Sequence, residues 1–494
     1  MSRVVVIGGG IGGLAVAARL ARFRHEVVLV ERAPRLGGKV GVLQRDGFTF
    51  DTGPSLVTLP ATLRDLFFKT GRQPLEDVLT LRPLDVLAHY RFPDGTEMDV
   101  PNRGVGSIAE AFQQALGGHA GDDWRRFHDG AEHVWETVRT PFVESPLDGA
   151  GTLLKLARQR PRDVLRVRPW QTLRNVGRSA FADDRQRLFL DRYATYTGSD
   201  PRRAPAVLQV IPYVEHTFGG WYVEGGLRRI VDVIADRARQ RGADLRTDSE
   251  VVRVTTSADG TVDGVVLHDE THIATDIVVS DVDASALYGA LLPTCREKQR
   301  LQRVQPSLSG FVLLLALRGT TPDLRQHTVL FGADYDAEMD AVFGEQARPP
   351  DDPTIYVSCA PDAAPAGHEA WFVLVNAPRH GTGPGCVDWD QPGLAASYTE
   401  RLVDLLAARG LDVRDRIMFA EHRSPADLER ATASPGGAIY GGSSNSRRAA
   451  FLRPANRSPV PGLYLVGGSA HPGGGLPMVL MSAAITAEMI GRAR

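Results

Sequence analysis

Both ends of the chain carry a short apolar run that leads into glycines and then into a helical pattern. Near the N-terminus, the run Val4–Ile7 precedes a glycine-rich segment, and apolar and small residues then favour a helix up to Leu20. A second strand is predicted over Glu26–Val30. Near the C-terminus, Leu463–Val466 precedes glycines and a helical pattern over Met478–Ile490. Apolar runs without alternation are typical of parallel strands buried on both faces, so we expect an α/β fold.

The glycine segment near the N-terminus has the spacing of a dinucleotide-binding loop. Gly8 allows a tight turn, Gly10 lets the backbone approach a pyrophosphate, and Gly13 lets the helix pack closely on the strand. The N–H groups at the helix N-terminus favour an anion. An acid, Glu31, follows the second strand 18 positions after Gly13, where a carboxylate can bind a ribose. The predicted dinucleotide site therefore consists of Gly8, Gly10, Ile11, Gly12, Gly13 and Glu31.

Composition and charge exclude several other classes of protein. The 494 residues are 43% hydrophobic and 23% charged with a net charge of −2, which suits two or three folded domains and does not suggest a nucleic-acid binder. Cys295, Cys359 and Cys386 lack the spacing of metal ligands, so we predict no metal site and no disulfide framework. The longest clean apolar run, Phe311–Leu317, has seven residues against the roughly 20 that a membrane span needs. Since the chain opens directly into a strand, we expect a cytoplasmic protein without a signal peptide.

Two further segments have the features of cofactor loops. Beyond the acid, Arg32 and the run Gly37-Gly38-Lys39 would bring backbone N–H groups and positive charge to phosphates. An aromatic strand at 48–50 then runs into a turn that contains Gly53, Pro54 and Ser55. The dinucleotide fingerprint does not recur, which favours FAD over NAD.

The C-terminal glycine loop is the second half of the predicted cofactor site. It runs from Gly467 and Gly468 through His471 to Leu476, Pro477 and Met478 at the start of a helix. A proline is tolerated in the first turn of a helix, and the glycines let a ligand approach closely. The partial positive charge of this helix N-terminus would stabilise a reduced flavin by about 0.3–2 kcal/mol.

These motifs resemble those of known flavoproteins. Gly37-Gly38-Lys39 and the turn Asp51–Ser55 are similar to segments of the flavin-containing amine oxidase and phytoene desaturase superfamily. The C-terminal run with Gly467, His471, Pro472, Gly473, Gly475 and Leu476 resembles the signature of bacterial-type phytoene desaturases, with Gly474 as a departure. The segment Arg192–Gly198 resembles the carotenoid 3,4-desaturase branch.

The resemblance implies an activity and a cofactor. It implies FAD, a hydrophobic polyene substrate, hydride transfer from an allylic carbon to flavin N5, and oxygen or a quinone as electron acceptor. It places the backbone of Val252 against the adenine and makes His471 and Glu215 candidate catalytic residues. The segment 211–226 resembles a strand that crosses the substrate channel, whereas Asp281-Val282-Asp283 departs from the family pattern and is assigned no role.

The resemblance also implies how the chain is divided. We expect an FAD-binding Rossmann-like domain (1–70, 226–300 and 440–494) and a discontinuous substrate-binding domain of mixed sheet plus helices (71–110, 200–225 and 301–439). A helical cap (111–199) completes the α/β architecture.

The segment Lys155–Arg178 holds eight basic residues, one acid and a tryptophan, Trp170. Such a segment is either a solvated helical cap or a contact for anionic lipid headgroups. Because a polyene must be loaded from a bilayer, we expect peripheral contact with the inner face of the cell membrane.

Three alternatives stay open. The same cofactor would also serve a carotenoid isomerase or a terminal-methyl oxygenase. An amine oxidase would need an aromatic cage beside the flavin, and the C-terminal loop contains none that we can identify. A non-enzymatic prenyl-lipid carrier on the same fold would not need the flavin.

Overall fold

The apolar runs from the two ends of the chain lie in one parallel sheet. Its strands stand in the order β10-β2-β1-β14-β22, and all neighbours are parallel. In β1, Val4 and Val6 pack into one buried cluster and Val5 and Ile7 into another, so both faces are covered and the run does not alternate. The strands are β1 (Arg3–Ile7), β2 (Glu26–Val30), β10 (Asp244–Arg246), β14 (Ile277–Ser280) and β22 (Leu463–Leu465).

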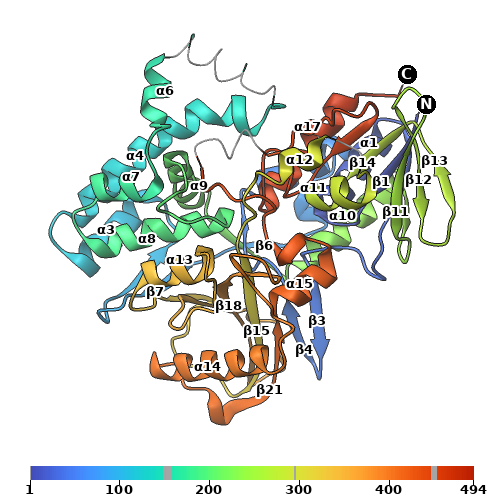
Figure 1. Cartoon of the computed structure of the whole chain (residues 1–494). Helices are drawn as coiled ribbons and strands as arrows, with labels where there is room; N and C mark the ends of the chain where they lie inside the picture. Colours follow the sequence, from blue (N-terminus) through green and yellow to red (C-terminus); the bar gives the residue numbers. More distant parts are fainter. Residues whose placement is uncertain are drawn as a thin grey trace.

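Each face of this sheet has its own cover. One face packs against α1 (Ile11–Arg22), α10 (Arg228–Gln240) and α17 (Leu476–Ile490). The other packs against an antiparallel sheet of β11 (Val251–Thr256), β12 (Val262–Leu267) and β13 (His272–Ala274). The first and last described residues lie close together at the edge of this layer (Figure 1). The helices and strands predicted for this part of the chain are confirmed.

The computed structural model describes residues 2–147, 151, 158, 161–293, 296–446 and 453–493. Cys295 and part of the basic segment, including Lys155 and Arg160, lie outside the described residues. Among the described residues, no helix combines the length and the apolar character needed to cross a membrane.

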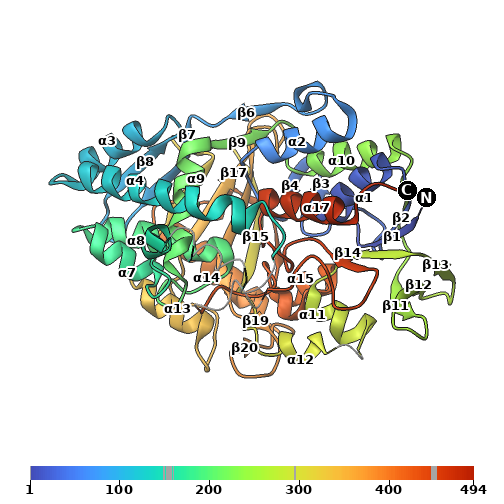
Figure 2. The same ribbon diagram turned by 90° about the horizontal axis from the view of Figure 1, so that it is seen from above.

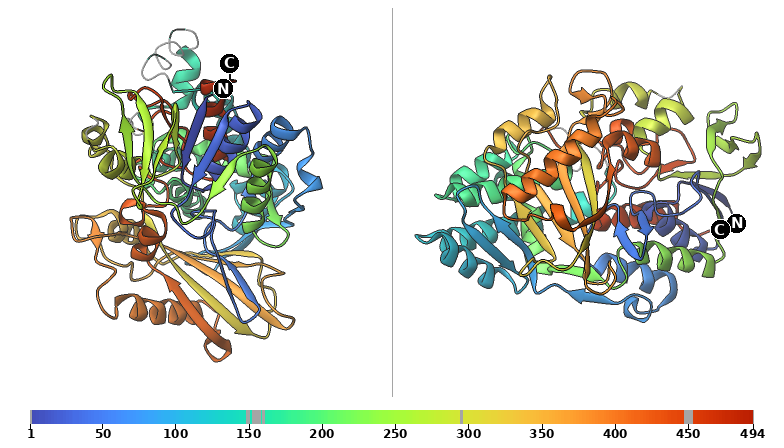
Figure 3. Two further views of the ribbon diagram at one scale, coloured as in Figure 1. Left: turned by 90° about the vertical axis from the view of Figure 1, so that its right-hand side faces the viewer. Right: turned by 90° about the horizontal axis from the view of Figure 1, so that it is seen from below.

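A second, seven-stranded sheet forms the other large layer. Its order is β21-β15-β18-β17-β16-β7-β8, antiparallel except for the pair β16 and β7. Helix α14 (Leu394–Ala408) packs on one face, and the hairpin of β3 (Val42–Arg45) and β4 (Phe48–Asp51) packs on the other. Figure 3 shows this sheet beside the parallel sheet. The strands are β7 (Val86–Arg91), β8 (Glu97–Pro101), β15 (Ser309–Arg318), β16 (His327–Leu330), β17 (Ile355–Cys359), β18 (His368–Ala377) and β21 (Ile417–Arg423).

A layer of helices stands at the far end of the second sheet (Figure 2). Its core is aromatic: Trp124 lies against Phe112, Phe127, Phe181 and Phe189 with ring centroids 4.6–5.7 Å apart. The helices are α3 (Val105–Leu116), α4 (Ala120–Val138), α6 (Pro161–Val167), α7 (Leu173–Ala180), α8 (Asp184–Arg192) and α9 (Val210–Phe218).

Shorter elements join the layers. A small sheet has the strand order β5-β9-β6. These elements are β5 (Val57–Thr58), α2 (Ala61–Gly71), β6 (Leu81–Pro83), β9 (Gly220–Val223), α11 (Ala284–Ala286), α12 (Glu297–Leu301), α13 (Tyr335–Phe343), β19 (Arg379–His380), β20 (Cys386–Val387) and α15 (Pro425–Thr432).

The strand expected over 211–226 is wrong for its first half. Residues 210–218 form helix α9, and only Gly220–Val223 form a strand, β9. Tyr213 packs against Ala131 and Trp135 of α4, which stabilises the helix although its valines and aromatics favour a strand in isolation. Gly219, with φ of 74°, ends the helix and turns the chain into β9.

Candidate active site

The glycine loop between β1 and α1 has no room for side chains. A Cβ at Gly13 would lie 2.0 Å from the carbonyl oxygen of Gly8, and Gly8 itself has φ of 99°. Helix α1 begins after Gly10 without a side-chain cap, so N–H groups of its first turn face outward. This arrangement fits a dinucleotide pyrophosphate, which needs close backbone approach and free donors.

Two chain segments complete the cradle. The Glu31 carboxylate, at the end of β2, accepts hydrogen bonds from the backbone N–H groups of Gly9 (2.7 Å) and Ala33 (2.8 Å). Gly37 donates its N–H to the Gly9 carbonyl at 2.8 Å, and Gly38 lies against Gly10. The predicted acid and the predicted glycine pair therefore lie beside the glycine loop.

Asp281, to which the sequence pattern assigned no role, lies at the centre of this loop. A Cβ on Gly10, Gly12 or Gly467 would come within 2.2–2.4 Å of its carboxylate oxygens. Burial, opposed by a hydrogen bond from the Gly13 N–H, raises the pKa of Asp281 to about 7. The only sequence signal was its place directly after β14, at the carboxyl edge of the sheet.

Lys39 ties the glycine loop to a segment about 400 residues away. Its ammonium donates to the carbonyls of Ala438 (2.9 Å) and Ile439 (2.7 Å). Burial lowers the pKa of Lys39, while the charges of Asp283 and Asp281 act in the opposite direction. The predicted cation is thus inside the site, bonded to backbone carbonyls.

The C-terminal loop meets the N-terminal loop at Gly467. A Cβ at Gly12 would lie 3.1 Å from the Cα of Gly467, so the two glycines allow the loops to touch. Helix α17 begins after Gly475 without a side-chain cap and carries Pro477 in its first turn. Leu476 packs on the core of the parallel sheet, and Met478 is half-buried in the same first turn of α17. The two helix N-termini predicted for the cofactor are therefore both present, and the N-cap residue of each is a glycine that has no side chain to cap it.

Two side chains that sequence reasoning missed, the partly buried Arg453 and the buried Asn456, hold the C-terminal loop. Arg453 donates to the carbonyls of Gly468 (2.6 Å), Gly442 (2.9 Å) and Tyr440 (3.2 Å). Burial lowers the pKa of Arg453 to about 10. Asn456 donates to the carbonyl of His471 at 2.9 Å. A small cavity beside this loop is lined by Asp283, Ser285, Arg453 and Ser469, among others.

His471, a predicted catalytic residue, turns its ring toward the helical layer. Its Nε2 lies 2.9 Å from the carbonyl oxygen of Ser145 and donates to it. Burial lowers the pKa of His471, and the nearby charge of Arg453 acts in the same direction.

Ser55, from the turn after β4, begins a chain of hydrogen bonds into the second sheet. Its hydroxyl bonds to that of Tyr356, which lies 2.7 Å from Nδ1 of His327. A Cβ at Gly53, next to Pro54, would lie 1.9 Å from the Lys39 carbonyl oxygen, so the two predicted cofactor turns are packed together.

Glu215, the other predicted catalytic residue, is buried on α9. Its carboxyl accepts a hydrogen bond from the Tyr193 hydroxyl at 2.7 Å, and the Tyr196 hydroxyl also bonds to it. Burial raises the pKa of Glu215. The neighbouring His216 is held neutral, since burial lowers its pKa to about 3.

Two of the predicted cofactor residues have exposed side chains. The Arg32 side chain is exposed and donates to the backbone carbonyl of Arg430 at 2.6 Å. The Val252 side chain is 41% exposed, and its residue falls at an irregularity of the ladder between β11 and β12.

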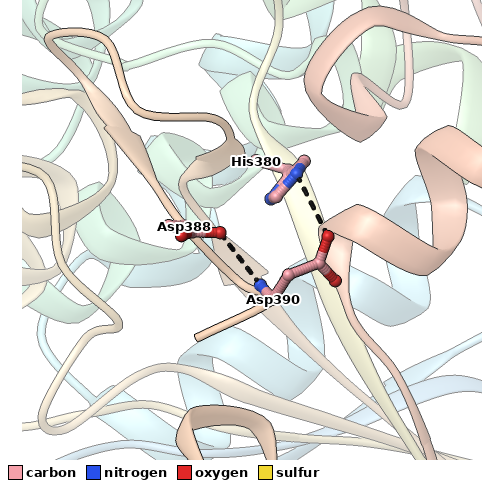
Figure 4. Close-up of side chains that lie close together, drawn as sticks. All are labelled: His380, Asp388 and Asp390. Carbon is pink, nitrogen blue, oxygen red and sulfur yellow. Dashed lines mark hydrogen bonds and ion pairs between the residues drawn. The ribbon is translucent and has the colours of Figure 1, made fainter. Parts of the chain in front are cut away.

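One cluster has metal-ligating side chains but other partners. His380, Asp388 and Asp390 stand together near the surface (Figure 4). Asp390 is already paired with Arg430 at 2.8 Å, and Nδ1 of His380 accepts the Trp389 N–H at 3.2 Å. The cluster therefore links the segment that follows β20 to α15 through polar contacts.

Comparison with known proteins agrees with this geometry. The family model described as "Flavin containing amine oxidoreductase" matches residues 11–490. Three similar proteins are a 1-hydroxycarotenoid 3,4-desaturase of Flavobacterium sp. (strain P99-3), a hydroxyneurosporene desaturase of Cereibacter sphaeroides and a 4,4'-diapolycopene oxygenase of Methylomonas sp.. They are 31%, 33% and 32% identical, over 99% of this chain and 97–99% of theirs.

Solved structures share the fold. A putrescine oxidase variant superposes with a TM-score of 0.66 at 15% identity, covering 99% of this chain and 98% of its own. An oxidoreductase from Methanosarcina mazei gives a TM-score of 0.65 at 18% identity, covering 98% of this chain and 100% of its own. Because the family model matches residues 11–490, the chain belongs to the flavin containing amine oxidoreductase family, and it is an FAD-dependent oxidoreductase.

Proposed function

We propose that this protein introduces conjugated double bonds into a carotenoid or a carotenoid precursor. The observation that carries the proposal is the similarity to carotenoid desaturases along almost the whole of both chains. The protein's glycine loops, acid and uncapped helix N-termini support the cofactor that such a reaction needs.

We infer that FAD is bound by residues of both loops. Backbone N–H groups at the start of α1 would bind the pyrophosphate, and Glu31 would bind the ribose. The start of α17 would favour negative charge on the isoalloxazine. The proposed contacts are Gly8, Gly10, Ile11, Gly12, Gly13, Glu31, Arg32, Gly37, Gly38, Lys39, Gly53, Pro54, Ser55, Val252, Gly467, Gly468, Leu476, Pro477 and Met478.

The proposed reaction removes a hydride and a proton from two neighbouring carbons of the polyene. When bound, FAD supplies a two-electron acceptor for the hydride. The protein's part is to position the chain and exclude water, while the proton leaves to solvent or to a nearby acceptor such as Glu215 or His471. Oxygen or a quinone would finally accept the two electrons that leave the polyene with the hydride, so the oxidation of the polyene is matched by the reduction of this acceptor.

The domain division also remains a proposal. We propose that the parallel sheet with its helices holds FAD and that the seven-stranded sheet with the helical layer encloses the polyene. The glycine loops at both ends of the chain belong to the parallel sheet and its helices, which supports the cofactor part of this division.

Contact with a membrane is proposed for the edge of the helical layer. Leu165 and Trp170 are 59% and 47% exposed, and arginines at 162, 166 and 168 lie beside them. Apolar and basic side chains together suit the surface of an anionic bilayer, from which the polyene would enter. We therefore propose a location on the inner face of the cell membrane.

A second candidate reaction is the oxygenation of a terminal methyl group. A 4,4'-diapolycopene oxygenase is 32% identical over 500 residues, about as similar as the desaturases are. Both reactions need the same flavin, so the product decides between them.

The test is expression in cells that make phytoene, neurosporene or hydroxylated lycopene derivatives, with pigments resolved by chromatography and mass. A loss of two hydrogens supports desaturation, whereas a gain of oxygen supports the second candidate. An unchanged mass with a new retention time would indicate isomerisation. Purified protein that holds FAD but leaves every polyene unchanged would refute the proposal, and protein that binds a polyene without FAD would indicate a carrier.

A further inference from the structure

Arg192 is a cation in the interior of the helical layer that lies among tyrosines. It ends α8, and its guanidinium lies 5.3 Å from the Tyr196 ring, 5.7 Å from Tyr90 and 5.9 Å from Tyr356. Two nearby arginines differ from it: Arg174 pairs with Asp191 and Asp336, and Arg202 with Asp200 and Asp340. Within the described part of the chain, no carboxylate forms an ion pair with Arg192.

The hydrogen bonds of Arg192 go to neutral hydroxyls through one nitrogen. Its Nη1 donates to Tyr196 at 3.1 Å and to Tyr90 at 3.4 Å. The nearest acid, Glu215, has no direct hydrogen bond to Arg192 among the described residues. It interacts instead with the hydroxyls of Tyr193 and Tyr196. Neither Nε nor Nη2 donates a hydrogen bond to any of the described residues, so a guanidinium edge with parallel donors is left for another acceptor.

The tyrosines around Arg192 are removed from bulk water and still retain accessible surface. Burial raises the pKa of Tyr196 and of Tyr440 to about 12 each. Arg192, Tyr196, Tyr356 and Tyr440 are nevertheless only half-buried. Side chains with both properties suit contact with a ligand inside the protein.

This group of residues adjoins both proposed flavin loops. Tyr356 bonds to Ser55 in the turn after β4. The Tyr440 ring lies where a Cβ on Gly474 would come within 2.5 Å, in the loop before α17. Arg192 is close enough to Tyr440 and His327 to shift the pKa of both. A ligand on Arg192 would thus lie next to the reacting end of a polyene.

The chemistry of the ligand follows from the donors. The donors of Arg192 that have no partner among the described residues would lose water beside an apolar substrate, which is costly unless the ligand offers them an oxygen. His327 adds a second polar atom, since its buried Nε2 has no hydrogen-bond partner among the described residues. Because the acceptors that Arg192 already has among the described residues are neutral hydroxyls, a neutral hydroxyl oxygen is the same kind of partner for its remaining donors.

We propose that Arg192, positioned by Tyr196, binds a hydroxyl group at the reacting end of the polyene and selects substrates that carry one. A hydroxyl two or three carbon–carbon bonds from the oxidised carbon lies within about 5 Å of it, which agrees with a site next to the flavin loops. This inference rests on the proposed function and adds that the terminal hydroxyl is the part of the substrate that Arg192 recognises.

The test uses the FAD-loaded full chain and two acyclic polyenes that differ only in a terminal hydroxyl. We expect the wild type to favour the hydroxylated polyene in kcat/KM. Arg192→Met should lower kcat/KM for that polyene by about 10- to 100-fold and leave the other unchanged, so that the preference disappears. Arg192→Lys should restore part of it, and Tyr196→Phe should show a smaller loss of the same kind.

Arg178→Met, which removes an exposed arginine from the same layer, is the matched control and should keep the preference. FAD content and thermal midpoint identify a variant that fails to fold, in which case Tyr196→Phe decides. An equal loss for both polyenes, or a wild type without preference, would overturn the proposal.

A binding measurement separates this inference from the proposed function. Fully conjugated polyenes with a terminal hydroxyl, a terminal carboxylate or neither are titrated into the protein, and binding is followed by polyene absorption. We expect the hydroxylated polyene to bind about tenfold more tightly than the plain one, and Arg192→Met to abolish the difference. Tighter binding of the carboxylate would overturn the assignment of a neutral oxygen. An enzyme that converts neither polyene but shows this preference would refute only the desaturase.

Discussion

The carboxyl group of Asp281 lies against Gly12, in the first turn of α1, where a Cβ added to that glycine would come within 2.4 Å of Oδ1. An ionisable acid therefore occupies the loop that we propose for the FAD pyrophosphate. Burial raises the pKa of Asp281 to about 7, and the Glu31 carboxylate contributes in the same direction, while Lys39 opposes both. Protonated, the group is compatible with a phosphate beside it; ionised, it repels one.

FAD affinity should therefore depend on pH through Asp281. Above about pH 7, binding requires uptake of a proton, so the Kd of FAD should rise by up to about tenfold per pH unit. Asp281→Asn, which keeps the shape but cannot ionise, should bind FAD with a nearly constant Kd. The measurement is flavin fluorescence during titration of apoprotein between pH 6 and about pH 9.

The same raised pKa affects the apoprotein. Because the folded pKa exceeds the unfolded one, the contribution of this group to folding stability declines as pH rises from about 4 to about 7.

The control for the pH dependence of FAD binding is Asp334→Asn, which removes a helix-capping acid from α13 and should leave that dependence unchanged. If the Kd of FAD for the wild type did not change with pH, the proposed link between FAD binding and protonation of Asp281 would be contradicted.

Gly13→Ala should abolish FAD binding. The added Cβ would lie 2.0 Å from a backbone oxygen, which cannot move away as a flexible side chain could. We expect a loss of stability of about 1–3 kcal/mol and purified protein with little bound flavin. Absorbance at the flavin band and thermal unfolding measure the two effects.

Gly106→Ala provides the matched control for this glycine. Gly106 lies in the first turn of α3, and a Cβ added there would have no described atom within 4 Å beyond its own helix and chain neighbours. Its replacement should leave flavin content unchanged and stabilise the helix by up to about 1 kcal/mol. Flavin retention in Gly13→Ala would refute the assigned role of the loop.

The sequence predicted the parts of the site that depend on local spacing. Gly8, Gly13 and Glu31 belong to one strand-turn-helix-strand unit, so their positions follow from a short stretch of chain. The two ends of the chain could be paired because each carries the same pattern of strand, glycines and helix. That part of the fold is confirmed by the parallel sheet.

The residues that the sequence could not reveal act across long separations. Arg453 binds carbonyls of two segments, one with Tyr440 and Gly442 and one with Gly468. Arg192 contacts tyrosines from β7, β17 and the turn after its own helix. Neither has a neighbour in the chain that signals a role. Helix α9 was misjudged for the same reason, since its packing on α4 outweighs the strand preference of its residues.

Binding to anionic vesicles should depend on the exposed apolar residues at 165 and 170. Leu165→Glu combined with Trp170→Glu removes two apolar side chains and adds two negative charges. We expect at least about a tenfold loss of partitioning into phosphatidylglycerol vesicles in a sedimentation assay, with FAD content unchanged. Phe68→Glu, at an apolar residue 62% exposed on α2, is the control and should bind as the wild type does. Equal binding of all three proteins would contradict the proposed membrane contact.

The pH dependence of activity should distinguish a proton-transferring His471 from a positioning one. Its Nε2–H is donated to the Ser145 carbonyl, and burial lowers the pKa of the ring below its ordinary value of 6.5. The ring is therefore neutral at neutral pH, and the stability that it contributes is present there and is lost as pH falls below 6.5. We expect His471→Ala to lower the thermal midpoint and raise the KM for the polyene, because the C-terminal loop loses its link to the helical layer. The shape of the kcat profile between about pH 5 and pH 9 should be the same in both proteins. A wild-type profile with an acidic limb that disappears in His471→Ala, together with an unchanged KM, would instead make His471 the group that accepts the proton.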